Sequence, residues 1–150
     1  MIAINPSSTS DNQQLVTFRC GNLLLGLEIS NVQEINRQTD VTTIPEAPSH
    51  VHGAINLRGD VVTVIDLRTV LGFSSESENR SGRNVIIRSN GELIGLMADG
   101  VSDIINVSSS QIEPTPSNIE GVDSRYFSGV FSSDNELVVI LNLDEIVDVE

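Results

Sequence analysis

Two histidines and one cysteine are the side chains of this sequence best suited to metal binding or nucleophilic catalysis. His50 and His52 lie two residues apart, which places both imidazoles on one face of an extended segment. A zinc site needs three or four protein ligands, and neither Cys20 nor the scattered acids supply the others at ligand spacing. We therefore expect surface or partly buried histidines, a buried structural thiol at Cys20, and no bound metal or other cofactor.

No group of residues predicts a catalytic nucleophile. No serine lies in a G-x-S-x-G elbow, and Cys20 has no recognisable local signature. The chain contains no lysine, which excludes a Schiff-base lysine and the lysine of a P-loop. Neighbouring carboxylates, such as Glu76 with Glu78 and Asp144 with Glu145, fall in polar or terminal segments where solvation explains them. The sequence therefore predicts a protein that is not an enzyme.

Charge and hydropathy exclude further classes of function. The formal net charge of −13 argues against nucleic acid and against anionic membrane surfaces, which both attract basic proteins. No apolar run approaches the ~20 residues that span a bilayer. The first residues lack the positive and apolar regions of a secretory signal. We therefore expect a cytoplasmic protein without direct membrane insertion.

The secondary-structure elements that would position any functional side chains occur twice along the chain. Residues 18–35 align without a gap on residues 87–104, and residues 53–71 align in the same way on residues 129–147. Glycines and apolar residues recur together in both alignments, so the chain contains two copies of one unit. Its β-branched, aliphatic composition and evenly spaced turn signals favour an all-β fold. Five or so short strands in each copy are typical of small barrels.

Composition divides the chain into four segments. The polar start and the charged, glycine-containing middle lack hydrophobic periodicity, which is typical of tails and linkers. The predicted segments are a mobile tail at 1–14, a first lobe at about 15–73, a linker at 74–83 and a second lobe at about 84–150. Residues 15–150 would form one domain, and a terminal strand could cross between the lobes.

Two predicted elements of the first lobe concern the candidate site. Ser30 is expected to cap a short helical turn over Asn31–Ile35, with Val32 and Ile35 pointing inward. Val51–Leu57 and Val61–Asp66 read as two strands joined by a turn at Arg58-Gly59-Asp60. Val41–Ile44 is expected to form another short strand.

The two copies differ most at that turn. Asn56-Leu57-Arg58-Gly59 in the first copy corresponds to Ser132-Ser133-Asp134-Asn135 in the second. An arginine fork suits a partner's carboxylate or carbonyl groups, but it also suits an internal salt bridge to Asp66 or Glu34. Both interpretations stay open. Asp66 and Arg68 are read as a structural pair, and Asp99-Gly100 as a turn.

Five short segments occur in a characteristic order. They are VQEI at Val32–Ile35, IPEAP at Ile44–Pro48, GAINLRG at Gly53–Gly59, VIDLR at Val64–Arg68 and DGVSDI at Asp99–Ile104. Together they closely resemble the CheW family of chemotaxis coupling proteins, and the resemblance covers nearly everything from Leu15 to Val147. One departure is Thr63, where many members carry proline.

The resemblance implies a fold, a function and partners. The fold would be two small five-stranded, SH3-like barrels packed side by side. The function would be non-enzymatic coupling of chemoreceptors to a CheA-type histidine kinase, at the cytoplasmic side of membrane-bound receptor arrays. The partners would be the regulatory domain of the kinase and the helical receptor tip, with self-association into array rings left open. The end of the chain at Glu150 resembles the stand-alone coupling protein.

The resemblance also assigns positions on or beside partner-binding surface. These are Val32, Glu34, Gly53, Asn56, Leu57, Arg58, Gly59, Asp99 and Gly100. Two alternative functions stay open: a coupling protein of a non-flagellar pathway, such as a type IV pilus system, and a small ligand-binding barrel. The second alternative requires a pocket with convergent polar groups, for which the sequence offers no candidate.

Overall fold

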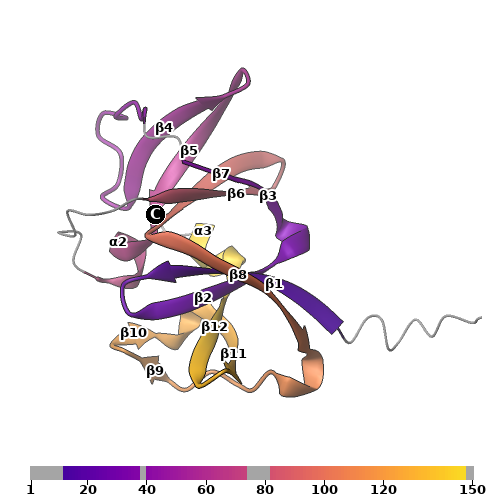
Figure 1. Ribbon diagram of the computed structural model, residues 1–150. Coiled ribbons are helices and arrows are strands. Elements are labelled where there is room, and N and C mark those ends of the chain that lie inside the picture. Colours follow the sequence, from indigo (N-terminus) through magenta and orange to yellow (C-terminus); the bar gives the residue numbers. More distant parts are fainter. Residues whose placement is uncertain (1–11, 38–39, 74–81, 148–150) are drawn as a thin grey trace, which may run out of the picture.

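The computed structural model of this protein describes residues 12–37, 40–73 and 82–147. Two five-stranded sheets dominate this part of the chain and lie one above the other (Figure 1). This arrangement confirms the predicted all-β fold class and its two five-stranded units. None of the helices within the described ranges is long and apolar enough to cross a membrane.

Sheet I is the lower sheet in Figure 1, and sheet II is the upper one. In spatial order, sheet I contains β11 (Phe127–Ser133), β12 (Glu136–Leu141), β2 (Leu23–Glu28), β1 (Asn12–Cys20) and β8 (Gly100–Ser108). Sheet II contains β3 (Val32–Asn36), β6 (Arg83–Ser89), β7 (Glu92–Ala98), β5 (Asp60–Asp66) and β4 (Val51–Leu57).

Short elements lie between the strands of the two sheets or follow the last strand. They are η1 (Ile29–Asn31), α2 (Leu67–Leu71), η2 (Ser109–Gln111), the β9–β10 hairpin (Asn118–Ile119 and Val122–Asp123), η3 (Ser124–Tyr126) and α3 (Leu143–Val147). The helical turn α2 ends at Gly72, which adopts a φ of 87° that favours glycine.

The two sequence copies exchange hairpins. Sheet I combines β1 and β2 of the first copy with β8, β11 and β12 of the second, whereas sheet II combines β6 and β7 with β3, β4 and β5. Parallel pairing joins the copies at equivalent places, Gly26 opposite Ile140 in sheet I and Gly95 opposite Val64 in sheet II. Consecutive lobes at 15–73 and 84–150 therefore do not coincide with the two sheets.

Several predicted boundaries need correction. β1 begins at Asn12 and β6 at Arg83, so parts of the predicted tail and linker are strand; residues 1–11 and 74–81 lie outside the described residues. Residues Val32–Asn36 form strand β3 and not the expected helical turn. The helical turn lies earlier in the chain, at η1. The predicted strand at 41–44 is reduced to a single bridge between Thr42 and Ala54.

One main hydrophobic cluster joins the two sheets. Phe18 and Leu25 of sheet I pack in the same cluster as Val85 and Leu96 of sheet II, and all four are fully buried. Cys20 is also fully buried there, as predicted. Because the shared core removes these apolar side chains from water on both sheets, hydrophobic burial couples the two sheets into one folding unit.

Candidate partner-binding surface

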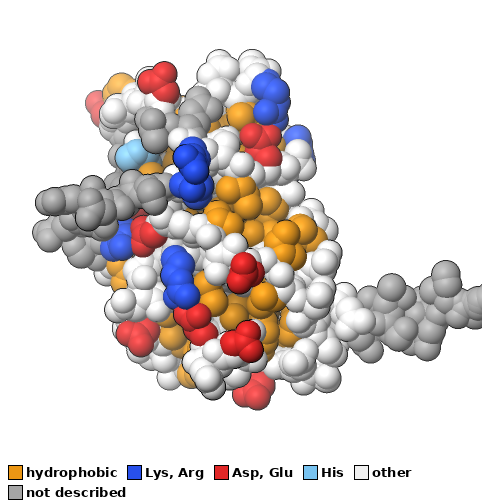
Figure 2. Space-filling model, viewed as in Figure 1, with side chains coloured by type: hydrophobic (Ala, Val, Ile, Leu, Met, Phe, Trp, Pro, Cys, Tyr) orange, Lys and Arg blue, Asp and Glu red, His pale blue; other side chains and the backbone are white. Residues whose placement is uncertain are grey.

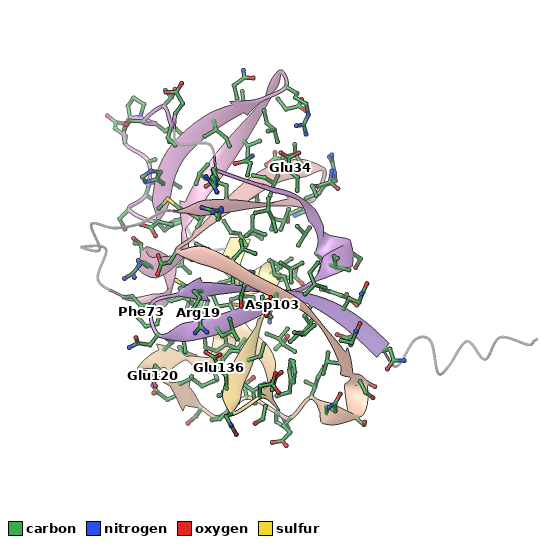
Figure 3. All side chains as sticks on the ribbon, in the orientation of Figure 1. Arg19, Glu34, Phe73, Asp103, Glu120 and Glu136 are labelled. Carbon is green, nitrogen blue, oxygen red and sulfur yellow. The ribbon has the colours of Figure 1, made fainter. Side chains whose placement is uncertain are left out.

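Strand β3 carries two of the predicted site residues. Val32 is half-buried and packs against the main core. The register shifts between Val32 and Glu34, which pair with Ile87 and Ile86 of β6, so Gln33 forms a bulge. Glu34 thereby projects from the edge of sheet II (Figure 3).

The β4–β5 turn holds the next group of site residues. Leu57 and Asp60 pair, and the two residues between them, Arg58 and Gly59, have φ values of 51° and 92°. Positive φ at both positions is the geometry of a type I′ hairpin, which suits the twist of the flanking strands. The side-chain oxygen of Asn56 accepts a hydrogen bond from the Gly59 N–H at 3.0 Å, which fixes the turn.

The turn presents Arg58 to Glu34. The Arg58 Nη2 donates to Glu34 Oε1 at 2.5 Å, so the internal salt bridge considered from the sequence exists, with Glu34 and not Asp66 as its acid. β3 and β4 are the opposite edges of sheet II, and the ion pair connects them. The hydrogen bond from Arg58, with a second from Asn36, lowers the pKa of the Glu34 carboxyl.

Gly53 and Leu57 lie in the interior. Leu57 is only 8% exposed and belongs to a core cluster. Gly53 is buried where the chain preceding β4 crosses it, and a Cβ there would lie 2.6 Å from the carbonyl oxygen of Thr42. Its equivalent, Gly129, is crowded in the same way by Ile112. The structural demand for close backbone approach explains why both copies have glycine at this position.

Asp99 and Gly100 lie on a different part of the molecule from Glu34 and Arg58. The Asp99 carboxylate accepts two hydrogen bonds from Arg68 and one, at 2.8 Å, from the Gly21 N–H in the β1–β2 turn. Gly100 begins β8 and pairs with Arg19 of β1. Asp99 therefore ties a hairpin of sheet I to α2, which follows a strand of sheet II. Asp66 and Arg68, which the sequence analysis interpreted as a structural pair, do interact: Asp66 caps α2 by accepting from the Arg68 N–H, while the Arg68 guanidinium bonds to Asp99.

An apolar surface lies between the two sheets. The sequence analysis did not predict this surface. Ile35 of β3 is 38% exposed, and Val101 and Ile104 of β8 are 38% and 56% exposed. Figure 2 shows hydrophobic side chains gathered between the two sheets on the viewed face. We name Ile35, Val101 and Ile104 the β3/β8 surface. Ile35 was expected to point inward with Val32, but in strand β3 burial alternates along the chain, so residues three apart face opposite sides and Ile35 is exposed.

The second copy lacks the ion pair of the first. Asp103 occupies the position of Glu34, and Asp134 occupies that of Arg58. Two acids cannot form a salt bridge, so the corresponding edges of sheet I are not joined by these side chains. Asp103 lies on β8 (Figure 3), where its backbone N–H and carbonyl oxygen both bond to the Thr17 hydroxyl. The difference makes the two ends of the molecule chemically distinct.

The two histidines lie in different environments. His50 is buried, with 8% of its surface exposed, and His52 is exposed on the bulge of β4. His50 contributes its carbonyl oxygen, which accepts from the Asp66 N–H at 2.8 Å. Within the described ranges, no group of three or more His, Cys, Asp or Glu side chains lies close enough together to hold a metal ion.

Residues 14–150 match the family described as the CheW-like domain. The chemotaxis protein CheW of Rhizobium meliloti is 30% identical over 138 residues, which cover 92% of this chain and 89% of that protein. The CheW of Helicobacter pylori is 30% identical over 144 residues, covering 94% and 87%. The crystal structure of the scaffolding protein TtCheW from Thermoanaerobacter tengcongensis is also similar, with a TM-score of 0.84, 30% identity, and coverage of 92% of this chain and 89% of that chain.

Proposed function

Because this chain belongs to the family of CheW-like domains, we propose that it is a non-enzymatic adaptor that couples chemoreceptors to a CheA-type histidine kinase in a chemotaxis array. The single observation that carries this proposal is the apolar β3/β8 surface, which lies beside an edge of each sheet. Exposed apolar patches of this kind mark interaction sites on soluble proteins.

The β3/β8 surface suits the helical tip of a receptor. A helix that docks in a groove presents an apolar stripe, and Ile35, Val101 and Ile104 offer three aliphatic contacts from two different sheets. Binding there would require both sheets in their observed arrangement. The adaptor would thus work in the cytoplasm, at the membrane-bound array, through protein contacts alone.

The hairpin of Arg58 suits the regulatory domain of the kinase. Arg58 is exposed and is held by Glu34 and by a defined turn, so its remaining donors point to solvent in a fixed place. A pre-organised arginine loses little conformational entropy on binding, which favours a specific contact. Asn56, Arg58 and Gly59 would line this contact, whereas Gly53 and Leu57 would support it from the interior.

Binding measurements with the two partners test the proposal. Isothermal titration of the purified protein with the kinase regulatory domain, and separately with a receptor cytoplasmic fragment from the same organism, should give saturable binding of each. Ile104→Glu should weaken the receptor complex, because it places a charge in the apolar surface. Ile44→Glu is the matched control, because Ile44 is 36% exposed but lies on the segment before β4. Binding of neither partner would refute the proposed function.

A further inference from the structure

An ion pair covers the outer surface of β2 in sheet I. Arg19 of β1 donates from Nη1 to Glu136 Oε2 at 2.6 Å and from Nη2 to Oε1 at 3.0 Å. Since β2 lies between β1 and β12 in the sheet, this bidentate pair spans it (Figure 3). Arg19 pairs in register with Leu24 of β2.

The equivalent place in sheet II is open. Arg88 corresponds to Arg19 and pairs in register with Leu93 of β7, as Arg19 does with Leu24. Asp60 corresponds to Glu136, but its side chain is one methylene shorter. Within the described residues, Arg88 makes one hydrogen bond, from Nη1 to the Gly91 carbonyl oxygen at 3.4 Å, and no salt bridge.

A cavity of about 430 Å³ occupies this place. Its lining includes Arg88, Val61, Thr63, Leu93, Asp60 and Glu92. Val61 is 73% exposed, the highest value among the large hydrophobic side chains that the structure describes. The volume lies within the range of ~300–1,000 Å³ typical of binding pockets. The cavity therefore combines an arginine that has no carboxylate partner among the described residues with a largely exposed aliphatic side chain.

We propose that this cavity receives a segment of a partner protein that presents one carboxylate to Arg88 and an apolar side chain to Val61. The Arg19–Glu136 pair is the internal template, because it shows a carboxylate bound by an arginine at the equivalent position of the same fold. Next to Arg88, charge complementarity favours an acid over a base, because the guanidinium would repel a cation and can donate from the N–H groups that do not bond to Gly91.

Two carboxylates limit what the cavity accepts. Glu92 and Asp60 lie in the same lining as Arg88, and both would repel a segment that carries several acids. Asp60 also lies near Arg58 and contributes to raising the pKa of that guanidinium. The segment should therefore be amphipathic with a single acid directed at Arg88, and the two lining acids should weaken its binding.

The experiment rests on the proposed function for its probes, the kinase regulatory domain and the receptor cytoplasmic fragment. Arg88→Ala is titrated with each by calorimetry, and Arg19→Ala is the matched control. Both variants remove one positive charge at equivalent positions, but the Arg19 guanidinium already has an internal acid. For one of the probes, Arg88→Ala should raise Kd by roughly threefold or more, and Arg19→Ala should leave it unchanged. Glu92→Gln should lower the same Kd.

The outcomes separate the two proposals. If wild-type protein binds the probes and folded Arg88→Ala, verified by circular dichroism, binds both with unchanged Kd, this inference is wrong and the proposed function stands. A higher Kd for Glu92→Gln would show a cationic occupant and would also overturn the inference. If the wild-type protein binds neither probe, the proposed function fails and the inference fails with it.

Discussion

Arg68 and Asp99 form a paired hydrogen bond, with Nε to Oδ1 at 2.9 Å and Nη2 to Oδ2 at 2.7 Å. Both side chains are largely shielded, with 16% and 20% of their surface exposed. The same carboxylate accepts from the Gly21 N–H, so one acid holds α2 and the β1–β2 turn together. The equivalent residues in the other copy are Ser30 for Asp99 and Asp144 for Arg68, so this connection exists once.

The first prediction concerns this connection. Arg68→Ala and Asp99→Ala should each lower the free energy of unfolding by about 1–3 kcal/mol, because a shielded charged group loses its hydrogen-bond partner. Urea denaturation measures both, and the double variant should show a coupling energy. Arg125→Ala is the control, because its ion pair with Glu145 is exposed and should be worth less than about 1 kcal/mol. Additive effects of the two alanine variants would contradict the assignment.

The second prediction concerns the two crowded glycines. Gly53→Ala and Gly129→Ala should each destabilise the fold by about 1–3 kcal/mol, because the added methyl group overlaps the crossing chain. Gly100→Ala should be close to neutral, since no atom lies within 4 Å of the position of its Cβ. Thermal denaturation followed by circular dichroism compares the three. Equal stability of all three variants would show that the crossing segment moves freely aside.

The third prediction is a pH dependence. Arg58 lowers the pKa of Glu34 in the folded state, so the salt bridge stabilises the fold fully above the unfolded-state pKa of glutamate, about 4.3. This contribution is lost as the pH falls through the folded-state pKa. The stability difference between wild type and Arg58→Ala should therefore shrink as the pH falls below about 4. NMR titration should also show the Glu34 pKa rising in Arg58→Ala, and an unchanged pKa would argue against the ion pair in solution.

The fourth prediction follows from the exchanged hairpins. Leu25→Ala, at a fully buried position of sheet I, should cost about 2–5 kcal/mol. Because the core is shared, amide hydrogen exchange should accelerate in sheet II as much as in sheet I. Slow exchange that persists in β6 and β7 alone would show that the two sheets unfold independently.

Local sequence patterns predict much of the architecture. The alignment of the two copies predicted the repeat, and the equivalent pairs Gly26 with Ile140 and Gly95 with Val64 reproduce it in the strand register. Apolar runs and glycine-containing turns predicted the hairpins, because strand pairing across a short turn depends on neighbouring residues. The same local information predicted the turn at Arg58 and gave Glu34 as one of two acids that could form a salt bridge with this arginine.

The tertiary structure alone decided how these pieces combine. The exchange of β1–β2 and β6–β7 between sheets depends on pairing between residues far apart in the chain, and both arrangements satisfy the same local pattern. Ile35 is exposed because residues 32–36 form a strand and not the expected helical turn, and Ile104 is exposed on β8 at an edge of sheet I. Arg19 and Arg88 occupy matching positions in the two copies, and only the fold shows that one meets a glutamate and the other a cavity.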